Sequence, residues 1–346
     1  MVAYKAKKLY HVSSFLRFMD SVINVSNLRK TYQVSKTEPG FLGSIKSLVN
    51  RKFEEVKAVD GVSLKINEGE LVGFIGPNGA GKTTTLKCLS GLLHYDTGFV
   101  SVLGFNPWER KDEFLKQIAL VMGQKNQLWW DLPPIETFNL NKVIYEIPEK
   151  EYKNNLEELV TLLEVQDVIN IQTRKLSLGQ RMKCELIASL LHSPKVLFLD
   201  EPTIGLDVVS QKKLRDFIRA YNQKNKSTII LTSHYMDDVK ELCKRIIIID
   251  KGRLLFDGKL EEITARFADH KIISVVLAKD IDPKKLEKIG KVREYSFPKV
   301  VFFVKREVAS MAASELLQHF PIADLNIEEV PIEDIIREVF TGKNLA

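Results

Sequence analysis

One short segment constrains this chain more than any other feature. Residues 76–83 fill every fixed position of the phosphate-binding loop G-x-x-x-x-G-K-[ST], reading Gly76-Pro77-Asn78-Gly79-Ala80-Gly81-Lys82-Thr83. The glycines let a tight loop turn backbone N–H groups toward phosphates, Lys82 can reach the β- and γ-phosphates, and the Thr83 hydroxyl can face Mg²⁺. An apolar run at 71–75 predicts a strand before the loop, and Thr84 begins a predicted helix whose positive end faces the phosphates. The segment therefore predicts a nucleoside triphosphate site with Mg²⁺ as its metal.

Length and composition set the scale of the protein. The chain has 346 residues, 45% hydrophobic and 28% charged, which suits a globular protein with one large domain and a smaller one. Its 51 basic and 45 acidic residues nearly cancel, leaving a net charge of +6. We therefore expect no nucleic-acid partner.

Nothing in the hydropathy pattern predicts a membrane span or a leader. No uninterrupted apolar run approaches the roughly 18 to 20 residues that a span needs, and polar residues break the segment after the first lysines. Cys88, Cys184 and Cys243 are widely separated, which fits a reducing cytosol and gives no metal-ligand spacing. Work at a membrane would therefore require a partner.

Strand-like and helix-like segments alternate through the first 260 residues and predict an α/β fold. The apolar runs 196–199, 228–231 and 246–249 are typical of buried strands in a largely parallel sheet. Between about 125 and 192 the pattern becomes helical, as in the apolar stripe of Leu156, Leu159, Val160 and Leu163. We expect a helical subdomain there, inserted into a domain of residues 22–262.

The two ends of the chain differ from this domain. Residues 265–346 predict a small α+β domain, with strands at 272–277 and 300–304 and helices at 308–317 and 332–340. Residues 1–21 are an N-terminal extension, and Met19 is a candidate for the true start.

The strand at 196–199 ends in Asp200 and Glu201. Asp200 would hold Mg²⁺ through a water, and Glu201 would polarise the water that attacks the γ-phosphate. Taken alone, such a run is as often an ordinary strand end. Its position downstream of a phosphate-binding loop favours the catalytic interpretation.

Just before this strand lies the pentapeptide Leu176-Ser177-Leu178-Gly179-Gln180, leading into a predicted helix to about Leu191. Ser177 is a natural N-cap, and Gly179 permits close approach of a phosphate to the first helical turn. An ordinary capped helix is the simple alternative. The order of motifs argues against it: phosphate loop, pentapeptide, Asp-Glu strand, then Asp207 and His234.

In this order of motifs the chain closely resembles the ATP-binding subunit of ABC (ATP-binding cassette) transporters, over residues 24 to about 260. The match comprises the LSGGQ motif at 176–180, with Leu178 in place of a glycine, the D-loop Asp207, the switch His234, the Q-loop Gln124 and the adenine-stacking Tyr32. The resemblance implies a P-loop fold and hydrolysis of ATP with Mg²⁺.

The same resemblance assigns roles to residues. Glu201, His234 and Gln124 would be catalytic, and Thr83, Gln124 and Asp200 would serve the metal. In the family a second subunit supplies the partners of the γ-phosphate, here Ser177, Gly179 and Gln180, with Asp207 beside them. Two chains would thus sandwich two ATP molecules head to tail and drive a separate membrane permease from the cytoplasmic face.

Several kinds of ABC protein are soluble and transport nothing. The single phosphate loop differs from the two-cassette translation factors, and Lys82 and Ser177 are only 95 residues apart, too close for the long coiled coil of the repair ATPases. A transporter subunit is our main prediction, with a repair or regulatory ATPase as the alternative. The ending at 332–340 looks like the tail of cassettes that pair with ABC-2 type permeases, mostly exporters. An importer subunit, the substrate and the identity of the second cassette stay open.

Two surface hypotheses complete the predictions. Within residues 36–57, Phe41, Ile45, Leu48, Val49 and Phe53 keep helical spacing among basic residues, which predicts an amphipathic helix for lipid or permease, or else a solvated insertion. Trp129 and Trp130 follow the Q-loop, where the family docks its permease. If exposed they would be interface anchors, and if buried they would be core.

Overall fold

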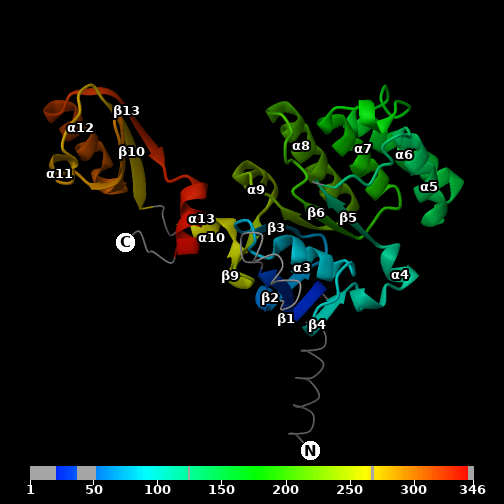
Figure 1. Cartoon of the computed structure of the whole chain (residues 1–346). Helices are drawn as coiled ribbons and strands as arrows, with labels where there is room; N and C mark the ends of the chain where they lie inside the picture. Colours follow the sequence, from blue (N-terminus) through cyan, green and yellow to red (C-terminus); the bar gives the residue numbers. More distant parts are fainter. Residues whose placement is uncertain (1–20, 37–51, 124, 266–268, 342–346) are drawn as a thin grey trace, which may run out of the picture. The chain divides into compact units, whose positions relative to one another are not determined.

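The computed structural model describes residues 21–36, 52–123, 125–265 and 269–341. The chain divides into two units, Met1–Asp257 and Gly258–Ala346, each described here by itself (Figure 1). The division falls a few residues before the predicted boundary at 262–265.

A six-stranded sheet forms the centre of the first unit. Its order is β5-β6-β7-β3-β8-β9, and the first five of these strands run parallel. The bounds are β3 (Leu71–Ile75), β5 (Ile118–Met122), β6 (Val196–Asp200), β7 (Thr228–Thr232), β8 (Arg245–Asp250) and β9 (Arg253–Lys259). Every residue of β6 and β7 is buried, as a parallel sheet covered on both faces requires. The predicted strands at 71–75, 196–199, 228–231 and 246–249 are confirmed.

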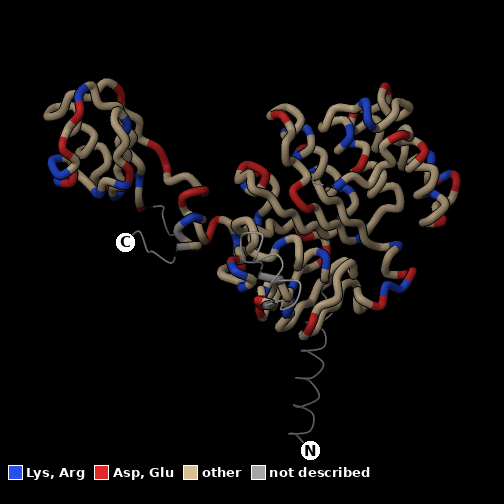
Figure 2. Tube along the Cα trace, in the orientation of Figure 1, with Lys and Arg blue, Asp and Glu red and all other residues tan. Residues whose placement is uncertain are grey.

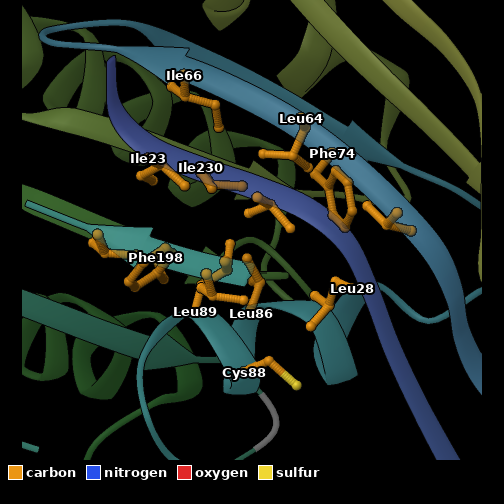
Figure 3. Close-up of a cluster of buried hydrophobic side chains, with 14 of the residues drawn as sticks. Ile23, Leu28, Leu64, Ile66, Phe74, Leu86, Cys88, Leu89, Phe198 and Ile230 are labelled. Atoms are coloured by element: carbon orange, nitrogen blue, oxygen red, sulfur yellow. The ribbon is translucent and has the colours of Figure 1, made fainter. Parts of the chain in front are cut away.

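The first unit also contains an antiparallel sheet of order β2-β1-β4. Its strands are β1 (Ser21–Lys36), β2 (Lys52–Asn67) and β4 (Thr97–Val102). Side chains from both sheets and from α3 (Lys82–Leu89) meet in one buried cluster. Figure 3 shows Ile23 and Leu64 of the antiparallel sheet, Phe74 of β3 and Leu86 and Leu89 of α3 in this core. The loop between β3 and α3 is therefore anchored in the core at both ends.

The helical pattern predicted between 125 and 192 corresponds to α5 (Pro134–Ile144), α6 (Glu149–Leu163) and α7 (Leu178–Leu190), which lie together in Figure 1. On α6 the buried side chains are Tyr152, Leu159, Val160 and Leu163, so most of the predicted stripe is core. The other α-helices in the described part of this unit are α4 (Asp112–Leu115), α8 (Val208–Asn225) and α9 (Met236–Leu242). No helix in the described part of the chain is long and apolar enough to cross a membrane.

The second unit contains a βαββαβ succession with sheet order β11-β12-β10-β13, the split-βαβ arrangement of ferredoxin-like folds. Buried residues of β10 and β12, such as Val275 and Phe302, pack against Leu316 of α12. The predicted α+β domain is confirmed. Its elements are α10 (Leu260–Ala265), β10 (His270–Leu277), α11 (Pro283–Leu286), β11 (Lys291–Ser296), β12 (Lys299–Lys305), α12 (Ala309–His319), β13 (Ile322–Glu329) and α13 (Ile332–Thr341).

One predicted helix is wrong where the structure describes it. Residues 52–57 belong to β2, and Phe53 is paired with Ser35 of β1 instead of continuing a helix from Phe41. Pairing with a strand distant in sequence overrides the local helical spacing. The rest of that hypothesis, at 37–51, lies outside the described residues, as do Met19 and Gln124. Over both units, Figure 2 shows basic and acidic residues interspersed.

Candidate functional site

Two glycines of the phosphate-binding loop, Gly76 and Gly81, leave no room for a side chain. Gly81 caps α3 with φ of 104°, a conformation that favours glycine. A Cβ atom at Gly81 would lie 2.2 Å from the carbonyl oxygen of Ala58, and one at Gly76 would lie 2.4 Å from that of Ile249. The loop thus lies directly against the backbone of β2 and β8, and any side chain at these two positions would displace it.

Lys82 lies within this loop. Its Nζ donates to the carbonyl oxygens of Gly76, at 2.6 Å, and Pro77, at 3.1 Å, and the residue is only 5% exposed. Burial lowers the pKa of the Lys82 ammonium, while the carboxylates of Glu201 and Asp200 oppose that shift. A partly desolvated cation held within a glycine-rich phosphate-binding loop is suited to bind phosphate.

Asp200 ends β6 beside the start of α3. Its Oδ2 accepts a hydrogen bond from the Thr83 hydroxyl and its Oδ1 accepts one from the Thr232 hydroxyl, both at 2.7 Å. The three residues meet because the carboxyl ends of parallel strands lie at one edge of a sheet. Thr83 and Asp200 supply the hydroxyl and carboxylate oxygens that fit Mg²⁺ in P-loop enzymes, where phosphates and water complete the coordination.

Glu201 adopts a left-handed backbone conformation, with φ of 55°. Such a conformation costs on the order of 1–3 kcal/mol in a non-glycine residue and persists where neighbours impose it. Here the Glu201 N–H donates to the carbonyl and hydroxyl oxygens of Thr232, at 3.1 and 3.0 Å. The Glu201 carboxylate is placed beside His234, with Oε1 lying 2.7 Å from Nε2. The two residues predicted to act at the γ-phosphate are brought together.

The segment leading to the Q-loop begins against the same strand. The Gly123 N–H donates to the Asp200 carbonyl at 2.8 Å. A Cβ at Gly123 would lie 2.1 Å from the Glu201 carbonyl oxygen, so only glycine fits. Gln124 itself lies outside the described residues, and its role stays a prediction.

The pentapeptide forms the start of α7. The Ser177 hydroxyl accepts from the Gln180 N–H at 3.2 Å, and the Gln180 side chain accepts from the Ser177 N–H at 3.0 Å, a complete capping box. Close by, a Cβ at Gly179 would lie 3.1 Å from the Ser210 hydroxyl. Ser210 in turn donates its N–H and hydroxyl to Asp207, the cap of α8, at 2.9 and 2.6 Å, and these bonds hold the pKa of the Asp207 carboxyl below its usual range. The two motifs are thus neighbours at the starts of two helices.

Tyr32 lies on β1 opposite Val56 of β2 and is 38% exposed. The Lys30 ammonium lies 5.7 Å from its ring centroid. A half-exposed ring can stack on a base, so adenine binding stays the prediction for this residue.

Trp129 and Trp130 are 56% and 49% exposed, and the interpretation of these two residues as core is wrong.

Sequence reasoning missed Thr232. This buried hydroxyl contacts both Asp200 and Glu201 and so fixes the relation between them. The available signal was its position: Thr232 ends a buried apolar strand directly before the Ser233-His234 pair.

The parallel sheet, the phosphate loop and the Asp-Glu strand end together define a P-loop nucleoside triphosphatase. Within that class, the family described as "ABC transporter" matches residues 59–204, and "EvrA-like ABC transporter, C-terminal domain" matches residues 269–328. The ABC transporter ATP-binding protein NatA of Bacillus subtilis (strain 168) is 34% identical over 218 residues, which are 62% of this chain and 88% of NatA.

Two further similarities extend this result. The linearmycin resistance ATP-binding protein LnrL of the same organism is 26% identical over 306 residues, covering 86% of this chain and 97% of LnrL. A solved ATP-binding subunit of an ABC transporter superposes with a TM-score of 0.60 at 24% identity, over 71% of this chain and 93% of that one, and so supports the fold. The chain belongs to the ABC transporter family, as an ATP-binding subunit that binds and hydrolyses ATP.

Proposed function

We propose that this chain hydrolyses ATP between two copies of itself and thereby drives a separate ABC-2 type permease that exports its substrate. Subunits of this family dimerise and pair with transmembrane permease subunits. The observation that carries the proposal is the division of the polar groups. Lys82, Asp200 and Glu201 meet at one sheet edge, whereas Ser177 bonds to Gln180 within the start of α7 and Gly179 lies against Ser210 of α8.

At the sheet edge each residue has a defined task. The loop N–H groups and Lys82 neutralise the phosphates, which is the main requirement of phosphoryl transfer. Glu201 accepts a proton from the attacking water and orients it. His234 lies 2.7 Å from Glu201 and would contact the γ-phosphate beside it. Thr83 and Asp200 would hold Mg²⁺, which supplies further neutralisation of the phosphate oxygens.

The start of α7 provides the remaining donors from the second copy. N–H groups at a helix N-terminus favour an anion, and Gly179 leaves room for a phosphate to approach. Val208 and Val209, directly after Asp207, are 77% and 66% exposed. An exposed apolar pair beside this motif is a surface that a second copy would cover.

Similarity over most of the chain supports export and a location at the membrane. The similarity to LnrL covers 306 residues, more than the first unit contains, so it includes part of the C-terminal unit. LnrL is named for resistance to linearmycin, an outcome that removal of a compound from the cell would give. We therefore place this chain at the cytoplasmic membrane face, held there by its permease. Trp129 and Trp130 are the proposed docking anchors, because exposed aromatic residues dominate such interfaces.

The proposal is tested with the full chain co-expressed with a candidate ABC-2 type permease from the same genome. In inside-out vesicles we expect ATP-dependent accumulation of linearmycin, used as a probe, and none with the Glu201→Gln variant. Accumulation only in right-side-out vesicles would indicate an importer. ATPase activity stimulated by DNA, with no co-purifying membrane protein, would favour a repair-type ATPase.

The same preparation tests docking. Replacing Trp129 and Trp130 by alanine is expected to reduce co-purification of the permease about tenfold or more. Trp108→Ala is the matched control, since Trp108 is 46% exposed but lies in the segment between β4 and β5. Equal retention of permease by both variants would contradict the anchor role.

A further inference from the structure

A fully buried carboxylate lies behind the catalytic pair. Asp238, in the first turn of α9, has 0% exposure. Its Oδ2 accepts from the Thr203 hydroxyl at 2.5 Å and from the Ser233 hydroxyl at 2.6 Å, and its Oδ1 accepts from the Arg215 guanidinium at 3.0 Å. Thr203 and Ser233 are themselves 1% exposed. Neither side chain has a role in the chemistry described above.

The two hydroxyl donors to Asp238 lie next to the proposed catalytic residues in the sequence. Thr203 lies two residues after Glu201, and Ser233 lies immediately before His234. One oxygen atom of Asp238 therefore connects the two segments that carry the catalytic glutamate and the switch histidine. The Ser233 hydroxyl also accepts from the Tyr235 N–H at 3.0 Å, so the backbone on both sides of His234 is fixed through the same group.

Stability alone does not account for this network. Arg215 balances the charge of Asp238, and its guanidinium lies 3.2 Å from Glu241 as well. Buried ion pairs of this kind often contribute little net stability compared with apolar residues of similar volume. A fully hydrogen-bonded buried network does, however, fix geometry, because each member has one favourable arrangement.

We propose that Asp238, with Thr203 and Ser233, positions Glu201 and His234 for hydrolysis. The inference rests on the proposed roles of those two residues. The three side chains touch neither nucleotide nor water in the reaction. They hold the backbone on each side of the 2.7 Å contact between Glu201 and His234, and a displacement there misaligns the base with the attacking water.

The test uses Thr203→Val, which removes one hydroxyl and keeps the side-chain shape. On the full chain, with its permease if turnover requires it, we expect kcat to fall about tenfold while KM for ATP changes less than about twofold. Thr203→Ser restores the hydroxyl and is expected to restore kcat. Thr137→Val is the matched control, because Thr137 is also buried and its hydroxyl has no hydrogen-bond partner among the described residues.

Each result decides one point. A kcat within about twofold of the unmodified chain for Thr203→Val overturns the inference, as does failure of Thr203→Ser to restore turnover. A raised KM and a lowered melting temperature, with unchanged kcat for the folded fraction, would show a structural role only and would also overturn it. The Glu201→Gln variant separates this inference from the function on which it rests. If Glu201→Gln abolishes turnover but Thr203→Val does not, only the positioning role fails.

Discussion

The sheet edge and the start of α7 satisfy their polar groups in opposite ways. At the edge, Asp200 and Glu201 bond to side chains from other elements, 31 residues or more away along the chain. At the start of α7, Ser177 and Gln180 bond to each other within three residues. The first arrangement exists only in the folded domain, whereas the second is a property of one helix end.

This difference suggests that the two regions form two parts of the proposed ATP site, of which only the sheet edge is fully built within one chain. Long-range contacts pre-organise the sheet edge for charge neutralisation before any nucleotide binds. At the capped helix start, the bonds between Ser177 and Gln180 stay within α7 and involve no residue of the sheet edge. The helix start is therefore suited to meet a phosphate that another molecule brings. Under the proposed function, a single chain builds one prepared half and one half that dimerisation would complete.

The largest expected effect is on the prepared half. Glu201→Gln keeps the hydrogen-bonding shape of the side chain but removes its basicity. We expect turnover to fall at least about a hundredfold, because general-base catalysis contributes on that order, while ATP binding is retained. Size-exclusion chromatography with ATP should show an accumulated dimer. Turnover similar to that of the unmodified chain would exclude Glu201 as the base.

A second experiment tests whether the two halves come from different chains. Ser177→Arg places a bulky charge at the helix start, and alone it should inactivate the homodimer. Two-tag purification then isolates mixed dimers of a Ser177→Arg chain with a Glu201→Gln chain. One site of such a dimer carries both defects and the other carries none, so about half of the original ATPase activity should return. Mixed dimers as inactive as either parent would show that both residues belong to one chain's site.

The sequence allows much of the fold to be predicted, for a physical reason. Strands β3 and β6 were expected almost residue by residue, because buried parallel strands appear as continuous apolar runs. The N-cap role of Ser177 was expected as well, since capping is local, and the structure shows it as part of a capping box. Residues 52–57 were misassigned because their strand pairing with β1 is non-local.

The contacts within the site were harder to predict. The bonds of Thr232 and Asp238 join residues far apart in sequence, and no local pattern encodes which hydroxyl reaches which carboxylate. Residue types and motif order therefore identify the candidate catalytic groups. The residues that hold those groups in place emerge only from the folded structure.

Two buried carboxylates, one near the sheet edge and one on α7, differ in how many hydrogen bonds they accept. Asp238, beside the sheet edge, accepts from three side chains. Glu185 of α7 is 1% exposed, and in the described part of the chain its carboxylate accepts only from the Gln127 N–H, at 3.2 Å. Burial raises the pKa of Glu185 from 4.5 to about 7, although that hydrogen bond and Arg181 act in the opposite direction. Ionisation of this group is therefore costly in the folded state.

The smallest predicted effect follows from that cost. Because folded Glu185 binds its proton more tightly than the unfolded chain does, the free energy of unfolding should decrease as the pH rises from about 4.5 to about 7, and then level off. Glu185→Gln removes this dependence and keeps an acceptor for Gln127, so it should stabilise the protein at pH 8 by about 1–3 kcal/mol and have little effect near pH 4.5. Urea midpoints at the two pH values measure the difference, with the exposed Glu157→Gln as control. If both variants raise the urea midpoint equally at pH 8, the effect is a general one of surface charge. Ionisation of Glu185 in α7 would then carry no particular cost in the folded state.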